Sequence, residues 1–209
     1  MPMLLATPLP RALRRQAPAA TPAPRPMTGP DASDPALMAL AGGGDRAAFN
    51  LLVGRHGERA LRVALRILGD AAEAEEVAQE AFLRAWQAAA GFDPARARFT
   101  TWLHRIVVNL AIDRTRRRAG APSAGLDAAA ELADPRPWPD ADAEAAEARA
   151  ALAAALEALP ARQRAAIALA YEQELSGADA AAALEVSERA LEGLLRRARQ
   201  FLRSRLEGS

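Results

Sequence analysis

The chain has 209 residues, of which 51% are hydrophobic and 4% aromatic, so it can form one or two domains with an apolar core. It has no cysteine, which excludes disulfides and thiolate metal sites, and no apolar run approaches the roughly 20 residues that a transmembrane helix needs. The net charge is only +1, but every basic residue is an arginine, which suits bidentate contacts to phosphate and to guanine edges.

The chain begins with a segment that we expect to be disordered. Residues 1–30 are rich in proline and alanine, and proline at this density prevents a stable helix. A regulatory tail is the alternative interpretation, and Met27 is an alternative start. Beyond this tail alanine dominates and no segment alternates like a strand, which predicts an all-α fold.

The helical pattern starts at Asp34, which we expect to cap a helix whose first position is Pro35. Three glycines at 42–44 end this helix, and Asp45 can cap the next one, which holds Phe49, Leu52 and Val53. A longer helical run through Leu61 and Leu68 then ends at Gly69.

An acidic helix is predicted next, in the segment AAEAEEVAQEAFLRAW at 71–86. Ala74, Val77 and Ala81 fall on one face, whereas the remaining positions through Glu80 are nearly all acidic or polar. Such a face is either simply solvated or a site for a basic protein partner.

Aromatic and basic residues alternate in the following loop and helix, from Phe92 to Arg118. Rings and guanidinium planes can stack on unpaired bases while positive charge follows the backbone, as a single-stranded nucleic-acid surface requires. Phe99 and Trp102 can equally be core residues, and we expect Thr101 and Arg105 to point outward.

Residues 119–143 are rich in proline, alanine and aspartate and are expected to form an extended acidic linker that includes Trp138. Two helices follow, one ending at Pro160 and one near Glu174. They are expected to pack behind the last pair of helices.

The last pair of helices has the shape of a helix-turn-helix DNA reader. Ser176 can cap a short alanine-rich helix, the chain breaks at Glu185, and Ser187 can cap a longer helix. That longer helix has one apolar stripe, and its arginines fall mostly off the stripe. An ordinary helical hairpin with a solvated arginine face is the alternative.

No pattern for covalent chemistry or cofactor binding is present. His56 and His104 are isolated and are expected to be surface or partly packed residues rather than metal ligands. There is no nucleophile–base constellation or phosphate-binding loop, so we expect no enzyme activity, catalytic residue, metal, cofactor or small-molecule substrate.

Five segments together resemble the extracytoplasmic-function (ECF) group of bacterial RNA polymerase sigma factors. They are DRAAFNLLVGRHGERALRVALRILGD, AEEVAQEAFLRAW, FTTWLHRIVVNLAIDRTRRR, LEALPARQRAAIALAYEQELS and VSERALEGLLRRARQFLRSRL. The resemblance covers about 34–118 and 144–206. It implies two small helical domains, region 2 at 34–118 and region 4 at 144–209, joined by the linker. The linker would thread through the polymerase near the RNA exit path, where we hypothesise that its acidic residues mimic nucleic acid.

The resemblance also implies core RNA polymerase and promoter DNA as partners, through three surfaces. The acidic helix would bind the coiled coil of the largest polymerase subunit through Glu75, Glu76, Gln79, Glu80 and Leu83. The loop and helix after it would bind the melted −10 element as single-stranded DNA through Arg96, Arg98, Phe99, Thr101, Trp102, Arg105, Asn109, Asp113, Arg116 and Arg117. The last helix would bind duplex −35 DNA through Ser187, Glu188, Arg189, Glu192, Gly193, Arg196 and Arg197.

The chain departs from the family pattern in the helix-turn-helix. Glu185 stands where the turn usually carries glycine, and a left-handed backbone there would cost about 1 kcal/mol. Ala180 stands where a larger aliphatic residue is common. Glu192 could accept a hydrogen bond from a cytosine amino group or could repel phosphate.

ECF membership would further imply a cytoplasmic protein controlled by an anti-sigma factor, often at the inner membrane. Three other classes of protein remain as alternatives. One is a helix-turn-helix regulator that acts without joining the polymerase, the second is an adaptor that binds only proteins, and the third is an enzyme.

Overall fold

The computed structural model describes residues 31–120, 142–172 and 175–207, so the predicted tail, almost all of the predicted linker and Trp138 lie outside the described residues. Within these ranges every regular element is a helix, and the all-α prediction is confirmed. The elements are α1 (Asp34–Gly42), α2 (Arg46–Leu68), α3 (Ala71–Gln87), the 3-10 turn η1 (Ala89–Gly91), α4 (Phe99–Gly120), α5 (Asp142–Glu157), α6 (Ala161–Ala170), α7 (Gly177–Ala183) and α8 (Glu188–Leu206).

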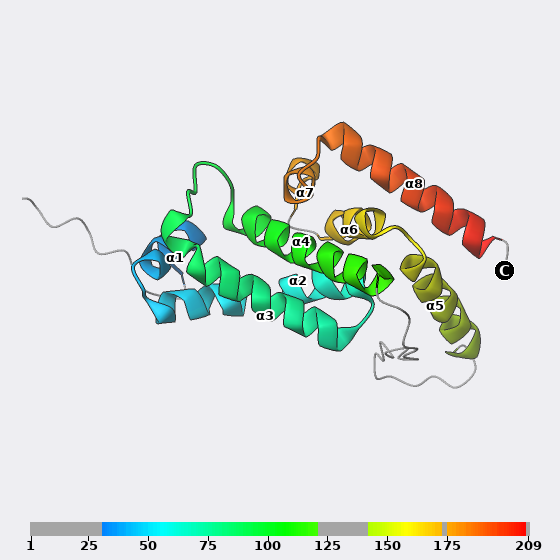
Figure 1. Cartoon of the computed structure of the whole chain (residues 1–209), viewed down its shortest axis with the longest axis horizontal. Coiled ribbons are helices and arrows are strands. Elements are labelled where there is room, and N and C mark those ends of the chain that lie inside the picture. Colours follow the sequence, from blue (N-terminus) through cyan, green and yellow to red (C-terminus); the bar gives the residue numbers. More distant parts are fainter. Residues whose placement is uncertain (1–30, 121–141, 173–174, 208–209) are drawn as a thin grey trace, which may run out of the picture.

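The first four α-helices form a bundle in which α2 contacts α1, α3 and α4 (Figure 1). Leu52 and Ile67 of α2 and Leu103 of α4 are fully buried at its centre. The predicted alanine face of α3 is confirmed, since Ala74 and Ala81 have no exposed surface. Their small side chains let neighbouring helices approach closely, so little aromatic bulk is needed in this core.

The predicted cap at Asp34 is wrong. Ser33 occupies the N-cap position without a side-chain hydrogen bond, and Asp34 is the first residue of α1. Its carboxylate instead contacts two residues of α2, Arg55 at 2.8 Å and His56 at 2.7 Å. Two donors on the neighbouring helix thus engage the carboxylate, so it docks α1 onto α2. The predicted cap at Asp45 is confirmed, since its carboxylate accepts from two backbone N–H groups of α2.

The predicted helix-turn-helix is present as α7 and α8. The hydroxyl of Ser176 caps α7 and forms a capping box with Asp179, and the hydroxyl of Ser187 accepts the N–H of Ala190 at 3.2 Å. Between the two helices Glu185 has a φ of 56°. The preceding helix α6 ends at Ala170, four residues before the predicted end at Glu174.

The two groups of helices, α1–α4 and α5–α8, pack against each other. Helix α6 contacts α2 and α4, and α7 lies against α4 (Figure 1). Leu169 of α6 and Leu184 after α7 belong to the same buried cluster as Leu52 and Leu103. One continuous apolar core therefore spans both groups, whereas the sequence had predicted two modules linked only by a tether.

The two histidines are buried, contrary to the expectation of surface or partly packed residues. His56 is 5% exposed and His104 is 2% exposed. The Nδ1–H of His104 donates to the carbonyl of Thr100 at 2.8 Å. Burial lowers the pKa of His104, against the opposing effects of the Thr100 carbonyl and the Glu172 charge. Helical position alone does not show that these rings face the core.

None of the helices in the described ranges has an apolar stretch long enough to cross a membrane. Among the same residues, no group of three or more metal-ligating side chains is gathered in one place.

Candidate nucleic-acid and protein interfaces

Three aromatic rings gather where the loop after α3 joins α4. Phe92 lies 5.2 Å from Trp102 and 6.1 Å from Phe99, measured between ring centroids. Phe99 is only 2% exposed and also packs on the ring of His56 at 5.2 Å, whereas Trp102 is half-buried. Phe99 is thus a core residue that supports this surface, and Phe92 and Trp102 are the rings that remain partly accessible.

Basic and polar side chains surround these rings on α4 and its preceding loop. Arg96, Arg98, Arg105 and Asn109 are exposed, as predicted. Further along the same helix Asp113, Arg116 and Arg117 are also exposed, and Arg116 lies 3.8 Å from Asp113. These side chains form a basic, ring-bearing surface along α4, which we call the α4 surface.

Helix α7 covers part of the α4 surface. The hydroxyl of Thr101 donates to the carboxylate of Asp179 at 2.7 Å, and Arg98 lies 3.7 Å from the same carboxylate. Arg105 forms an ion pair with Glu185 at 2.5 Å. The prediction that Thr101 points to solvent is therefore wrong for this structure, in which it is 5% exposed beneath α7.

A groove of about 480 Å³ runs between α3 and α4. Four of the five residues predicted to bind polymerase line it: Glu76, Gln79, Glu80 and Leu83. Glu75, the fifth, is exposed on the same helix but does not line the groove. Leu83 is 51% exposed. An exposed apolar side chain flanked by carboxylates can pack on the apolar face of an amphipathic helix while the carboxylates contact that helix's basic residues.

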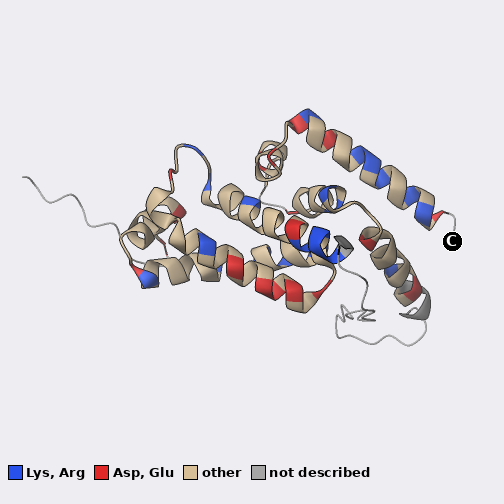
Figure 2. Cartoon of the chain, in the orientation of Figure 1, with Lys and Arg blue, Asp and Glu red and all other residues tan. Residues whose placement is uncertain are grey.

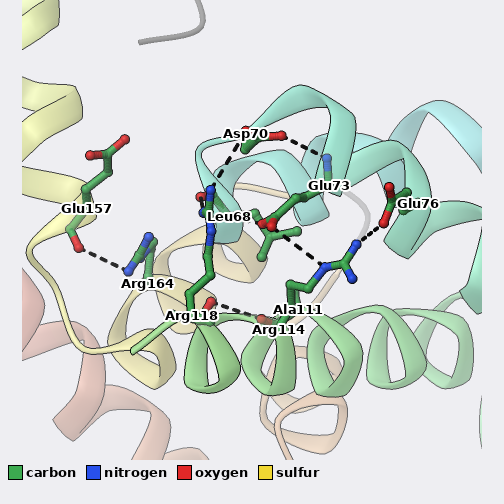
Figure 3. Close-up of polar contacts among 10 residues, drawn as sticks. Leu68, Asp70, Glu73, Glu76, Ala111, Arg114, Arg118, Glu157 and Arg164 are labelled. Carbon is green, nitrogen blue, oxygen red and sulfur yellow. Dashed lines mark hydrogen bonds and ion pairs between the residues drawn. The ribbon is translucent and has the colours of Figure 1, made fainter. Parts of the chain in front are cut away.

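The acidic face of α3 is partly neutralised by α4, which the sequence did not reveal. Arg114 forms an ion pair with Glu76 and lies 3.9 Å from Glu73. Arg118 lies 3.3 Å from Glu73 and 3.8 Å from Asp70 (Figure 3). The negative face predicted for α3 (Figure 2) is thus partly paired within the chain, and this includes the groove, where Glu76 pairs with Arg114 and Glu80 lies 2.7 Å from Arg84. The spacing of four between these arginines is the signal that indicates one shared helix face.

The first turns of α8 present the residues predicted to read duplex DNA. Glu188, Arg189, Glu192, Arg196 and Arg197 are exposed, and Gly193 is half-buried. Ser187 is exposed too, although its hydroxyl is engaged as the cap of α8. Beneath them Leu191 and Ala198 are buried, so the apolar stripe fixes which side of α8 faces outward. Figure 2 shows arginines along much of this helix.

Comparison with known proteins shows the family to which the chain belongs. Residues 52–120 match the family model for sigma-70 region 2, and residues 149–202 match the model for sigma-70 region 4. The RNA polymerase sigma factor CnrH of Cupriavidus metallidurans is 36% identical over 186 residues, which cover 85% of this chain and 96% of the relative. The ECF sigma factor SigM of Mycobacterium tuberculosis is 37% identical over 171 residues, which cover 81% of this chain and 83% of the relative. The chain belongs to the ECF family of RNA polymerase sigma factors.

Solved structures agree with this membership. The structure of CnrH in complex with the cytosolic domain of CnrY matches this sigma factor with a TM-score of 0.61 and 31% identity, over 84% of this chain and 98% of that one. The sigma factor RpoE of Bartonella quintana, in complex with the anti-sigma factor NepR, shares the fold with a TM-score of 0.58 and 22% identity over 76% of this chain and 96% of that one.

This sigma factor therefore acts in transcription initiation, with core RNA polymerase and promoter DNA as its partners. The resemblance seen in the sequence is confirmed. The alternative of a regulator that acts apart from the polymerase does not fit a chain that carries both sigma regions in order.

Proposed function

We propose that this ECF sigma factor binds promoters through two surfaces and core polymerase through a third. The observation that carries this proposal is that the three predicted contact sets fall on largely separate stretches of the fold, with Arg117 of the −10 set also lining the α3–α4 groove, and that most of their members are accessible. The α4 surface serves the melted −10 element, the first turns of α8 serve the −35 element, and the α3–α4 groove serves the polymerase.

At the −35 element the exposed arginines of α8 bind the duplex. Arg189, Arg196 and Arg197 are placed to contact phosphates and base edges, while the helix N-terminus favours a phosphate nearby. Glu192 on the same side can accept a hydrogen bond from a cytosine amino group. Ser187 keeps its role as the cap and contributes little directly.

At the −10 element the α4 surface captures bases that have left the duplex. Trp102 supplies a stacking face, and Arg105 and Asn109 supply donors for phosphate and base edges. Opening a few base pairs costs several kcal/mol, and selective binding of the unpaired strand offsets that cost. Phe99 is left out of the direct contacts because it is buried, and it acts by holding Trp102 in place.

On the polymerase side the α3–α4 groove binds a basic helical segment of the enzyme. Leu83 enters the partner's apolar face, and Glu80 and Gln79 contact its polar residues. The resemblance identifies this segment as the coiled coil of the largest polymerase subunit.

An anti-sigma factor is the third partner that we propose, after promoter DNA and core polymerase. CnrH, a relative similar over most of its length, was solved in complex with the cytosolic domain of CnrY. This sigma factor would then work in the cytoplasm and be held inactive by a protein inhibitor, with no covalent chemistry of its own.

In vitro transcription with core polymerase on genomic fragments, followed by mapping of start sites, tests this function. Wild-type protein should confer specific starts, and the triple variant Arg189→Ala, Arg196→Ala, Arg197→Ala should abolish them. Arg199→Ala with Arg203→Ala is the matched control, because both are exposed arginines of α8 outside the proposed set. Equal transcription from the triple variant would contradict the proposed role of α8.

A further inference from the structure

The turn of the helix-turn-helix and the α4 surface are joined by a set of polar contacts. Oδ1 of Asp179 accepts the hydroxyl of Thr101 at 2.7 Å, and Oδ2 of Asp179 lies 3.7 Å from Arg98. The carboxylate of Glu185 lies 2.5 Å from the guanidinium of Arg105. Helix α7 lies directly over α4 in Figure 1. We call Asp179 and Glu185 the latch carboxylates.

The latch carboxylates bind side chains of the α4 surface that are proposed to bind the unpaired −10 strand. A guanidinium binds a carboxylate and a phosphate by the same charge-assisted, often bidentate hydrogen bonds. Arg98 and Arg105 are both in the set proposed to bind the unpaired strand, and Thr101 lies between them. A DNA strand and helix α7 therefore cannot use these groups at the same time.

Asp179 is held ready as an anion. Hydrogen bonds from the Ser176 hydroxyl and from Thr101 lower the pKa of Asp179, which outweighs the opposing effect of its partial burial, and Arg98 acts in the same direction. Because the Ser176 contact is a capping box within α7, this carboxylate is fixed by its own helix before it meets α4. The latch is therefore preorganised on the region 4 side.

The backbone of Glu185 is strained, and the ion pair with Arg105 offsets part of that strain. Its φ of 56° lies in the left-handed region, where glycine is favoured and a side chain is strained. Only in the closed arrangement does its carboxylate gain the ion pair with Arg105. Closure therefore offsets part of the strain, and separation of the helix groups leaves it uncompensated.

The closure extends beyond these exposed contacts. Glu172, 6% exposed after α6, faces Arg59 of α2 at 4.0 Å, and Arg66 of α2 donates to the carbonyl of Ala168 at 3.5 Å. Leu169 and Leu184 lie in the apolar core shared with the first four helices. The region 4 helices are thus docked by apolar burial, with the latch carboxylates fixing where α7 sits on α4.

The −35 contacts are not covered in the same way. Arg189, Glu192, Arg196 and Arg197 remain exposed in this closed arrangement. Closure therefore affects the two DNA surfaces unequally, leaving α8 open to duplex DNA.

We propose that this sigma factor is autoinhibited by its own helix-turn-helix, in which the latch carboxylates take the place of the −10 DNA backbone on α4. The closed chain binds −35 duplex but binds −10 single strand only after the two groups of helices separate. This inference rests on the proposed −10 role of the α4 surface.

The absence of cysteine from the chain makes closure measurable in the full-length protein. Ala72→Cys on α3 and Gln200→Cys on α8 are exposed positions outside all proposed contact sets, and dyes there report separation by energy transfer. Glu185→Gly removes the latch charge and the backbone strain together, so the turn stays folded, and Glu185→Gln removes the charge alone. Glu207→Gln is the control, because Glu207 pairs only within α8, at 4.0 Å from Arg203, among the described contacts.

In both Glu185 variants we expect lower energy transfer between the dyes. We also expect about 2–5-fold tighter binding of a short non-template strand spanning a mapped −10 element, because the closed arrangement loses the stabilisation of one exposed ion pair. Affinity for the −35 duplex should not change, and Glu207→Gln should match the parent protein in all three measurements. The swap Arg105→Glu with Glu185→Arg should return energy transfer to the parent value, and it should abolish the gain in strand affinity because Arg105 is lost from the −10 contacts.

Unchanged energy transfer and strand affinity in both Glu185 variants would overturn the latch. Lower energy transfer with unchanged strand affinity would overturn the claim that the carboxylates replace DNA. If no variant binds the strand although energy transfer falls, the closure stands and the proposed −10 role of α4 fails instead.

Discussion

Arg105 of α4 and Glu185 of the α7–α8 turn form an ion pair at 2.5 Å that joins the predicted −10 surface to the helix-turn-helix. Both side chains are about half exposed, at 53% and 46%, so solvent and salt screen the pair. It cannot by itself hold the two groups of helices together. Its role is to set the position of a contact whose energy comes mainly from the shared apolar core.

A double-mutant cycle at this pair should give a small, salt-dependent coupling. With Arg105→Met and Glu185→Gln we expect about 0.2–1 kcal/mol at low salt, as for other exposed ion pairs. In about 1 M salt the coupling should disappear because the screening length becomes very short. Urea unfolding of the four proteins measures it, and a coupling of zero at low salt would show that the pair does not form in solution.

Removing the Asp34 carboxylate should weaken the docking of α1. Burial acts to raise the pKa of Asp34, but hydrogen bonds from His56 and Arg55 outweigh it and hold the pKa below its ordinary value of 3.8. Because the folded pKa is the lower one, this stability is present above about pH 4 and is lost as pH falls through the folded pKa. Asp34→Asn should therefore cost about 1–3 kcal/mol at neutral pH.

Urea unfolding of Asp34→Asn and wild type across the acid range tests this point. The difference between the two proteins should be constant at neutral and mildly acidic pH and should shrink below about pH 4. Asp45→Asn is the control, because asparagine also caps a helix well. A difference between Asp34→Asn and wild type that stays the same at the lowest pH would contradict the assignment.

His104 should make the fold sensitive to mild acid. Its burial lowers its pKa from the ordinary 6.5, so the unfolded chain binds a proton more readily than the folded one. Stability is therefore complete above about pH 6.5 and declines as pH falls from there through the folded pKa. His104→Gln, which keeps a polar group without the titration, should show a flatter dependence of unfolding free energy between about pH 7 and 5. An equally steep profile in the variant would assign the effect to other groups.

Leu83 should matter for polymerase binding and not for stability. Its side chain is 51% exposed beside the carboxylates of the α3–α4 groove. Leu83→Arg should weaken binding to core polymerase at least about tenfold, the scale of losing a central interface contact, with an unchanged unfolding midpoint. Ala72→Arg, exposed on the same helix outside the groove, is the control in a fluorescence titration with core polymerase. Equal affinities for both variants would place the polymerase site elsewhere.

Features of the fold that depend on local sequence were predictable. The caps at Asp45, Ser176 and Ser187 follow from a side chain that must satisfy the next helical N–H groups, and the structure has all three. The alanine face of α3 and the break at Glu185 follow from periodicity and spacing in the same way.

Contacts between distant segments were not predictable by these means. The burial of Thr101 depends on α7, which is far along the chain, and a threonine on an otherwise polar helix face gives no sign of it. Phe99 and Trp102 had two interpretations, and only tertiary packing separates the buried ring from the accessible one. Asp34 looked like a cap because aspartate before proline usually is one, yet donors on another helix attract it more strongly.

Permanganate footprinting of a mapped promoter most directly tests whether α4 binds the melted −10 strand while α8 binds the −35 duplex. With core polymerase, wild-type protein should make unpaired −10 thymines reactive, and neither the polymerase nor this sigma factor alone should do so. Arg105→Ala with Asn109→Ala, two exposed positions on α4, should keep protection of the −35 element and lose most of the −10 reactivity. Full reactivity with that variant, or reactive thymines without polymerase, would contradict the proposal that α4 captures the melted strand only within the polymerase complex.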